Sequence, residues 1–576
     1  MTGIRFGDVV VERKVPCTMR DGVTLYADVY RPRQAGSYPV LLLRQPYGRS
    51  IASTVSHAHP VWYVHHGYIV VVQDVRGRGD SEGEFVPFVN EANDGYDSVQ
   101  WAAQLPDSNG KVGMYGFSYQ GSVQWAAASK QPPNLVAIAP SMCAADIYHG
   151  WIYASGTLSP GVIPWAYQLA RDTARRAGDA EAENICTRVM RHPDSALWNL
   201  PYTEQHAVLK TYFPAYYDWV SHAEYDEYWR QVNWLEACRE HPVPAFHIGG
   251  WYDFLLTGTV QSFKALQNRQ ARTPELFHKL LIGPWVHIPW GRKAGGDDFG
   301  PLADGNVHIQ QLRWFDYWLK DRKDNGLFEE PAVQYFEPVT KTWRYADDFP
   351  SGNGDLSGGG GSAENGGQHA KRWYLSGSGK PANGALGGGK LTTEAREIGE
   401  AAPDVFVYDA RLPMPCDSYL PHDRSGIQDR YEILVYTSPP LQEDLHVFGS
   451  PAVHVQTGVL NGPTDLVAIL TVLTPDGKAK FLSVGRTEIG TGTEEEAAQW
   501  RTAEIVMRPL AVDLTAGSAI RLELTGSAFP LLARHPNGVA LRDINRAGAG
   551  DLRIATVAVR STAGEASWIQ LPLAGK

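Results

Sequence analysis

Short apolar runs alternate with amphipathic stretches along the first 143 residues of the chain. A continuous run of β-branched and aliphatic residues is typical of a strand that is covered on both faces of its sheet. We therefore predict buried strands at 38–43, 68–72, 112–115 and 135–139. The stretches at 94–105 and 119–130 have the pattern of helices. Strands and helices in alternation predict a doubly wound α/β sheet.

The pattern changes between residues 144 and 240, where strand-like runs are absent and aromatic residues are frequent. We predict a helical cap there, inserted into the α/β domain. The aromatic residues of this segment include Trp151, Trp165, Tyr216, Tyr217, Trp219, Tyr228, Trp229 and Trp234. The α/β pattern then returns, with strands predicted at 243–248 and 280–282 and helices at 258–269 and 307–322.

The last part of the chain is predicted to be all β. Glycine- and serine-rich segments at 351–367 and 376–390 are typical of flexible loops or a linker. The Pro475-Asp476-Gly477 turn predicts a hairpin, and many short strands separated by turns predict a β-sandwich or jelly roll. These strands are predicted at 445–459, 465–472, 519–524 and 552–559. The predicted domains are 1–143 and 241–347 for the α/β domain, 144–240 for the cap and 348–576 for the β domain.

Length, charge and the length of the apolar runs limit which classes of protein this chain can belong to. A chain of 576 residues is too long for one hydrophobic core, which stops growing at about 250–300 residues. The net charge of −11 comes without a basic block, so we expect neither nucleic acid nor a membrane surface as a partner. No apolar run approaches the roughly 18 residues of a membrane span, and no secretory signal is visible.

The five cysteines are scattered along the chain and lack the spacing of metal ligands. We expect them to be reduced thiols in a cytoplasmic protein, because disulfides are rare in that compartment. They are Cys17, Cys143, Cys186, Cys238 and Cys416.

The strongest chemical signal surrounds Ser118. A predicted strand leads into Gly116-Phe117-Ser118-Tyr119-Gln120-Gly121, and an apolar helix follows at once. This pattern is similar to the nucleophile elbow G-x-S-x-G, in which small neighbours allow the serine to occupy a strained strand-to-helix turn. The second glycine is displaced by one position, and Gln120 takes its place. The alternative is a serine that caps the helix of an ordinary strand–helix loop.

A serine nucleophile needs a base, because an unassisted hydroxyl is a poor nucleophile at neutral pH. In the α/β-hydrolase fold the acid and the histidine follow the serine in that order, each just beyond the end of a strand. Asp253 and His287 each follow one of the two later predicted strands. His247 lies within a strand and His241 before it, so both are poorer candidates. We therefore predict that Asp253 and His287 complete a triad with Ser118.

An oxyanion hole must place hydrogen-bond donors where negative charge develops. The backbone N–H of Tyr119, next to the serine, is one expected donor. The second is expected from the loop after the strand at 38–43, where Tyr47 carries the suitable hydroxyl. The alternative for Tyr47 is a side chain that packs a turn.

These motifs resemble the cocaine esterase-type serine hydrolases, relatives of X-prolyl dipeptidyl peptidases and α-amino acid ester hydrolases. The segments that carry the resemblance are 19–32 (MRDGVTLYADVYRP), 44–48 (RQPYG), 73–88 (QDVRGRGDSEGEFVPF), 116–121 (GFSYQG), 139–142 (APSM), 225–229 (YDEYW), 249–253 (GGWYD), 283–287 (GPWVH) and 465–485 (DLVAILTVLTPDGKAKFLSVG).

The resemblance implies that Ser118, Asp253 and His287 form the triad and that the Tyr47 hydroxyl and the Tyr119 amide form the oxyanion hole. It also implies an α/β-hydrolase domain with an inserted helical cap and a C-terminal jelly roll. This chemistry needs neither a metal ion nor an organic cofactor.

The residues after Asp253 bear on the substrate. In α-amino acid ester hydrolases, the resemblance implies, part of a carboxylate cluster that holds the substrate ammonium lies two and three positions after the catalytic aspartate. Those positions are Leu255 and Leu256 here, so an ammonium beside them would be desolvated without a partner. We therefore expect an apolar or aryl acyl group, in a pocket that includes Phe254, Leu255 and Leu256.

Trp151 and Trp165 fall at cap positions that match the aromatic acyl pocket of cocaine esterase-like enzymes, and the alternative is that they pack the cap. Three functions stay open: an esterase for apolar or aryl acyl groups, an acylase or peptidase-like amidase of the same fold, and a binding module. The last predicts a broken triad, whereas this sequence keeps all three residues. We expect a small-molecule ester or amide as the substrate, and a homodimer is compatible with the sequence.

Overall fold

The computed structural model describes residues 6–50, 57–153, 156–267, 272–350, 369–395, 402–490 and 499–574. The chain divides into two compact units. The first comprises 1–151 and 227–349, and the second comprises 152–226 and 350–576.

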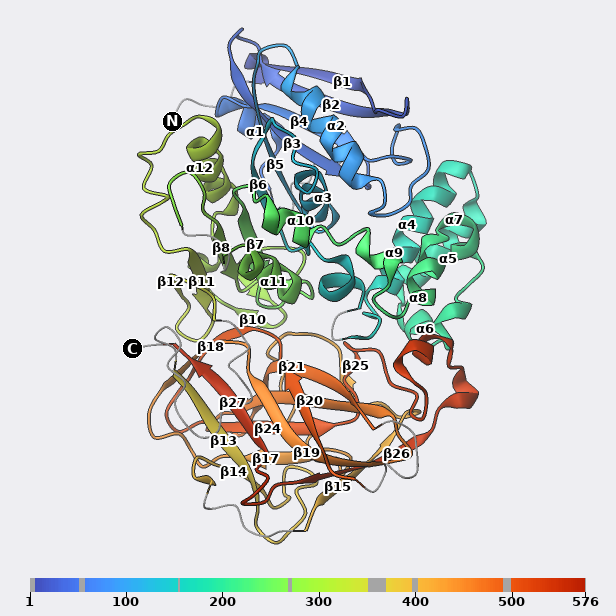
Figure 1. The fold of residues 1–576 in the computed structure, drawn as a ribbon, viewed down its shortest axis with the longest axis vertical. Helices are drawn as coiled ribbons and strands as arrows, with labels where there is room; N and C mark the ends of the chain where they lie inside the picture. The colour runs from blue at the N-terminus through green and yellow to red at the C-terminus, as the bar shows by residue number, and fades with distance from the viewer. Residues whose placement is uncertain are drawn as a thin grey trace. The chain divides into compact units, whose positions relative to one another are not determined.

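In the described part of the first unit, ten strands form one sheet in the order β1-β2-β4-β3-β5-β6-β7-β8-β11-β12 (Figure 1). Strands β3 to β8 are parallel, and β11 continues the sheet in parallel to β8. The strands are β1 (Val9–Thr18), β2 (Thr24–Pro32), β3 (Tyr38–Gln45), β4 (Ile69–Asp74), β5 (Ser108–Phe117), β6 (Leu135–Ser141), β7 (Phe246–Gly250), β8 (Lys279–Gly283), β11 (Val333–Glu337) and β12 (Thr342–Ala346). All six strands predicted for the α/β domain are present, as β3 to β8.

Helices cover both faces of this sheet. On one face, α1 (Pro60–His65) and α12 (Val307–Leu319) share a buried cluster with the strands, and the Tyr63 hydroxyl donates to Gln311 Oε1 at 3.2 Å. The other face carries α2 (Glu91–Ala103), α3 (Tyr119–Ala128), α10 (Leu235–Glu240) and α11 (Leu256–Gln267). Helices α2 and α3 pack closely at Gly95, where an added Cβ would lie only 2.7 Å from the Cβ of Ala127.

Every named element in the described part of 144–240 is a helix, as the sequence predicts. Besides α10, the longer ones are α4 (Val162–Ala177), α5 (Ala180–Arg191), α7 (Val208–Tyr212) and α8 (Ala215–Ser221). Residues 152–226 of this segment pack as part of the second unit, together with the β domain. Within that unit, the buried Asn545 side chain donates to the Tyr153 hydroxyl at 2.8 Å and to the Val220 carbonyl at 3.0 Å.

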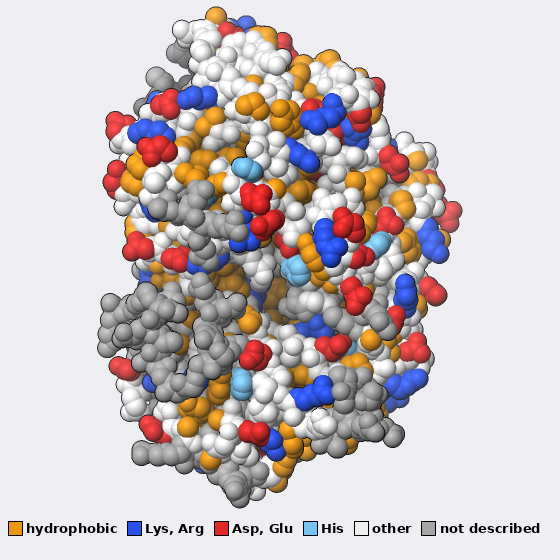
Figure 2. Space-filling view, in the orientation of Figure 1, with side chains coloured by type: hydrophobic (Ala, Val, Ile, Leu, Met, Phe, Trp, Pro, Cys, Tyr) orange, Lys and Arg blue, Asp and Glu red, His pale blue; other side chains and the backbone are white. Residues whose placement is uncertain are grey.

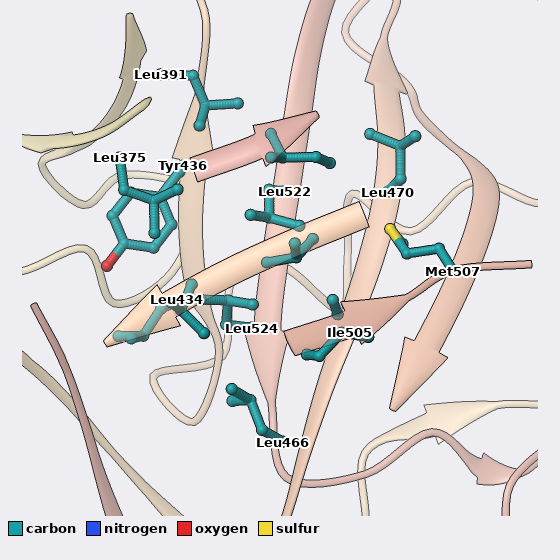
Figure 3. Packing of buried hydrophobic residues seen from close by; sticks show 14 of the residues in the cluster. Leu375, Leu391, Leu434, Tyr436, Leu466, Leu470, Ile505, Met507, Leu522 and Leu524 are labelled. Carbon is teal, nitrogen blue, oxygen red and sulfur yellow. The ribbon is translucent and has the colours of Figure 1, made fainter. Parts of the chain in front are cut away.

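The β part of the second unit is a domain of the jelly-roll class, built of strands with two short 3-10 helices at Leu541–Arg546 and Ala549–Asp551, and Figure 3 shows some of its buried side chains. The predicted hairpin joins β20 and β21 through Pro475-Asp476-Gly477, with Gly477 at a φ of +86°. The strands are β13 (His369–Gly377), β14 (Gly389–Thr392), β15 (Asp404–Asp409), β16 (Pro415–Cys416), β17 (Leu434–Thr437), β18 (Leu445–Gly449), β19 (Ala452–Leu460), β20 (Thr464–Leu473), β21 (Ala479–Ile489), β22 (Arg501–Val506), β23 (Leu510–Leu514), β24 (Ala519–Thr525), β25 (Phe529–Pro530), β26 (Ile554–Arg560) and β27 (Trp568–Leu573).

The segment at 376–390, predicted as a flexible loop or a linker, contains a loop, but this loop connects two neighbouring strands of one sheet and is packed against the domain. This segment includes the end of β13 and the start of β14, and Ala382 between them is fully buried. The Ala382 amide donates to Asp404 Oδ1 at 2.8 Å, so the small residues serve tight packing rather than a flexible connection. The similar segment predicted at 351–367 lies outside the described residues.

All five cysteines are free thiols, as predicted, and all five are buried. No helix among the described residues is long and apolar enough to cross a membrane. On the face seen in Figure 2, acidic and basic side chains are interspersed.

Candidate active site

Ser118 occupies the turn between β5 and α3. Strand β5 ends at Phe117 and α3 begins at Tyr119, and Ser118 between them has a φ of +59° and a ψ of −127°. A positive φ is uncommon for a residue with a side chain, and strained backbone of this kind is typical of functional sites. Its side chain is 7% exposed. The structure therefore has the strained strand-to-helix turn that the G-x-S-x-x-G pattern predicts.

The two glycines of this turn are explained by close contacts. A Cβ on Gly116 would lie 2.5 Å from the Cβ of Gln120, and a Cβ on Gly121 would lie 2.6 Å from the sulfur of Cys143. Gly121 therefore permits α3 to approach the segment after β6. This contact accounts for the displaced second glycine, because position 121 rather than 120 faces the neighbouring backbone.

Asp253 and His287 meet at the carboxyl ends of β7 and β8. The Nδ1–H of His287 donates to Asp253 Oδ1 at 2.8 Å, and Asp253 is fully buried. The imidazole ring lies against Phe117, with ring centroids 5.7 Å apart, and against Phe254, with centroids 4.7 Å apart. Since Phe117 directly precedes Ser118, these contacts bring the His287–Asp253 pair to the end of β5 that carries the serine.

His247, a poorer candidate by its position in the sequence, belongs to the core. It is buried on β7, between the rings of Trp125 and Phe263, and burial lowers its pKa well below the usual value. His241 follows the end of α10.

The turn that carries Tyr47 is fixed by hydrogen bonds on both sides. Tyr47 is half-buried and lies two residues beyond the end of β3, the strand next to β5. The buried Arg78 guanidinium donates to the Pro46 carbonyl at 2.8 Å, and the Gln45 side chain donates to the Gly48 carbonyl at 3.1 Å. The backbone on either side of Tyr47 is thereby held next to the strand that ends at the serine.

The side chain of Tyr119 is buried. Its hydroxyl donates to Glu91 Oε1 at 2.8 Å and accepts from the Phe88 amide at 3.0 Å, and burial raises its pKa well above the usual value. Glu91 in turn forms a buried ion pair with Arg44, whose Nη1 lies 2.9 Å from Glu91 Oε2, and burial raises the pKa of Glu91. The phenol is thus structural, and the predicted oxyanion donor is the backbone N–H of Tyr119 rather than its side chain.

Sequence reasoning missed this Arg44–Glu91 pair. Arg44 lies at the end of β3 and Glu91 at the start of α2, and both are almost completely buried. From a single sequence, a charged residue is expected on the surface of the protein. No rule of sequence spacing predicts that residues 44 and 91 form a pair.

The predicted pocket residues have different surroundings. Phe254 is 39% exposed, and its ring faces His287. Leu255 and Leu256 are fully buried. Trp151 is buried edge-on against Phe88, with centroids 5.4 Å apart. Trp165 belongs to the second unit, where it stacks on Trp219 with centroids 5.4 Å apart.

No group of three or more His, Cys, Asp or Glu side chains among the described residues is arranged to hold a metal ion.

The sequence of the chain is similar to those of known hydrolases. A family model for X-Pro dipeptidyl-peptidase (S15 family) matches residues 21–289, and one for the X-Pro dipeptidyl-peptidase C-terminal non-catalytic domain matches residues 325–549. Cocaine esterase from Rhodococcus sp. (strain MB1 Bresler) is 30% identical over 568 residues, which cover 93% of this chain and 94% of that protein. The chain belongs to the S15 family, and within it to the cocaine esterase type.

Solved structures agree on the fold of this S15 hydrolase. An α-amino acid ester hydrolase superposes with a TM-score of 0.75 at 22% identity and covers 100% of this chain and 99% of its own. An aminopeptidase from a marine sediment Thaumarchaeota archaeon gives a TM-score of 0.77 at 22% identity, over 98% and 96% of the two chains. The predicted α/β-hydrolase domain with its cap and C-terminal β domain is confirmed, and the chain is a serine hydrolase of the S15 family.

Proposed function

We propose that this S15 hydrolase cleaves esters of apolar or aryl acyl groups, with Ser118 as nucleophile, His287 as general base and Asp253 as the group that orients His287. The observation that carries the proposal is the 2.8 Å hydrogen bond from His287 to the buried Asp253, formed at the same edge of the sheet as the Ser118 turn with its positive φ. Because Nδ1 carries the proton bonded to Asp253, Nε2 is the nitrogen free to act as a base.

Acylation begins when Nε2 of His287 takes the proton of the Ser118 hydroxyl while Oγ attacks the acyl carbon. The new C–O bond pushes an electron pair onto the carbonyl oxygen, and the Tyr47 hydroxyl and the Tyr119 N–H stabilise that oxyanion. When the oxyanion collapses, the bond to the leaving alcohol breaks. The imidazolium then donates its proton to the leaving oxygen, and an acyl-Ser118 ester remains.

Deacylation repeats these steps with water. His287 takes a proton from the water molecule as its oxygen attacks the acyl carbon, and the same donors stabilise the second oxyanion. Collapse of this intermediate breaks the bond to Ser118 Oγ, which recovers its proton from His287. The products are a carboxylic acid and an alcohol.

The apolar acyl preference rests on the surroundings of Asp253. Phe254 presents an exposed ring against His287, and Leu255 and Leu256 stand where a carboxylate would be needed to hold an ammonium. An unpartnered ammonium costs several kcal/mol to desolvate, which corresponds to about 10² or more in kcat/KM.

The second candidate, an amidase, uses the same residues and differs in the leaving group that His287 must protonate.

A matched substrate set tests the proposal. The p-nitrophenyl esters of 3-phenylpropanoic acid and phenylalanine differ by the ammonium alone, and the p-nitroanilide of 3-phenylpropanoic acid replaces the ester by an amide. We expect the first ester to have a kcat/KM at least about 10²-fold higher than the phenylalanine ester and than the anilide. Equal rates for the two esters would refute the apolar acyl site, and a faster anilide would favour the amidase.

Phe254→Ala provides the matched variant for the pocket. Loss of an apolar contact is worth roughly 10-fold or more in discrimination between acyl groups. We expect the variant to lose about that factor for the phenylpropanoate ester relative to the acetate ester. An unchanged ratio would remove Phe254 from the acyl site.

A further inference from the structure

Two buried glutamines connect the serine turn to the turn that carries Tyr47. Gln45 and Gln120 are 1% and 2% exposed. The Phe117 amide donates to Gln120 Oε1 at 3.3 Å, Gln120 Nε2 donates to Gln45 Oε1 at 3.0 Å, and Gln45 Nε2 donates to the Gly48 carbonyl at 3.1 Å. We call this series of three hydrogen bonds the glutamine bridge.

Both ends of the bridge fix the orientation of its amides. The Phe117 N–H can only donate, so it requires the oxygen of Gln120, and the Gly48 carbonyl can only accept, so it requires the nitrogen of Gln45. The remaining nitrogen of Gln120 then faces the remaining oxygen of Gln45 as donor and acceptor. Since an unpaired buried amide is costly, the two side chains are held in this one arrangement.

The ends of the bridge adjoin the two proposed oxyanion donors. Phe117 and Gln120 enclose Ser118 and Tyr119 in the sequence, and Gln45 and Gly48 enclose Tyr47. Strands β3 and β5 are neighbours in the sheet, but both donors lie beyond the last residue of their strand, where the sheet hydrogen bonds no longer fix their separation. The glutamine bridge spans this gap.

We propose that Gln45 and Gln120 are positioning residues that set the separation of the Tyr47 hydroxyl and the Tyr119 N–H. This inference rests on the oxyanion roles proposed above. It also gives a reason for the departure from G-x-S-x-G, because position 120 carries a side chain that reaches the Tyr47 turn, and Gly116 leaves room for it. Neither glutamine touches the substrate in this account.

A double-mutant cycle tests the proposal. Gln120→Met keeps the size of the side chain and removes its hydrogen bonds. A misplacement of about 1 Å in an active site can cost about 10²-fold, and we expect Gln120→Met to lower kcat about 10- to 100-fold with KM within about threefold. In a Tyr47→Phe background, the same substitution should cost about threefold or less, because the donor that it positions is already absent.

Gln124→Met is the matched control. Gln124 is a fully buried glutamine one turn further along α3. Its amide donates to the backbone carbonyls of Gly116 at 3.2 Å and Gln120 at 3.0 Å and accepts from the Ala139 amide at 3.0 Å, and it bonds to neither glutamine side chain of the bridge. We expect any loss that it causes to be equal in the wild-type and Tyr47→Phe backgrounds. Gln45→Met breaks the bridge from its other end and should reproduce the coupling of Gln120→Met, even where one of the two variants folds poorly.

The outcomes separate the two proposals. An equal loss for Gln120→Met and Gln45→Met in both backgrounds, or no loss in either variant while Tyr47→Phe is impaired, overturns the positioning role and leaves the oxyanion assignment intact. A Tyr47→Phe variant with unchanged kcat overturns the oxyanion role and this inference with it.

Discussion

His287 and Asp253 are joined by a hydrogen bond of 2.8 Å between Nδ1 and Oδ1, and the aspartate has no exposed surface. A buried carboxylate that accepts from Nδ1 fixes both the tautomer and the ring orientation of the histidine. Because Phe117 and Phe254 contact the same ring, the imidazole is restrained from the serine side and from the aspartate side. Loss of the Asp253 carboxylate is therefore expected to lower turnover.

Asp253→Asn should lower kcat by about 10³–10⁴ while the protein stays folded. The amide is nearly the size of the carboxylate, but its NH2 group would donate to Nδ1 and favour the tautomer that leaves no base facing Ser118. Steady-state hydrolysis of a p-nitrophenyl ester measures the loss, and circular dichroism checks the fold. A loss below about tenfold would show that another group orients the base.

Tyr47→Phe should lower kcat by about 10²–10³, the usual cost of removing one oxyanion donor. The ring keeps its packing in the turn between Gln45 and Gly48, and only the hydroxyl is lost. We expect KM to change little, since the negative charge develops after substrate binding. Wild-type turnover in this variant would leave Tyr47 as a residue that merely packs its turn.

The strands and helices around the site were predictable because they are buried. The run at 38–43 became β3 and the helix predicted at 119–130 became α3, since a strand or helix packed on both sides carries a continuous or periodic apolar pattern. Strand β1, in contrast, is mostly exposed and carries Glu12, Arg13 and Lys14. It pairs with β2 at an edge of the sheet, and neither strand is among those that the apolar runs predict.

The candidate site was predictable where order and strand position define it. Ser118, Asp253 and His287 each follow a recognisable strand, so their placement at one edge of the sheet could be expected from the topology. The buried partners could not, because the Arg44–Glu91 pair and the Gln45–Gln120 bond join side chains whose proximity depends on the tertiary fold. Polar residues of these types are exposed in most proteins, and a single sequence gives no reason to bury them.

Glu91→Gln should destabilise the protein more than Tyr119→Phe. The first substitution leaves the buried Arg44 guanidinium without its counter-charge, which typically costs about 3–5 kcal/mol. The second removes one buried hydroxyl, at about 1–3 kcal/mol. Thermal unfolding followed by circular dichroism measures both, and the reverse order of Tm values would show that the ion pair contributes little.

Two buried histidines predict acid sensitivity. Burial lowers the pKa of His57 and His278 to about 4, and His278 Nδ1 accepts from the Ala245 amide, which requires a neutral ring. Unfolding restores a pKa of about 6.5, so the unfolded chain binds protons that the folded protein does not. Stability is therefore greatest above about pH 6.5 and falls as the pH drops towards 4, by about 2 kcal/mol per histidine at pH 5.

The pH dependence of Tm measures this effect. We expect the Tm to fall between pH 7.5 and pH 5.0, and to fall less in His57→Gln and His278→Gln, which remove the titrating groups. If the decrease were the same in both variants as in the wild type, the acid sensitivity would have to come from other groups.

Hydrolysis of p-nitrophenyl butyrate by the wild type, Ser118→Ala and Ser122→Ala in one buffer tests whether Ser118 is the nucleophile. Ser122 is the matched control, a fully buried serine on α3, the helix that follows Ser118, and its hydroxyl donates to the Ala144 carbonyl at 2.9 Å. We expect a loss of about 10⁴ or more in kcat for Ser118→Ala and less than about tenfold for Ser122→Ala. Equal rates for the wild type and Ser118→Ala would show that Ser118 is not the nucleophile.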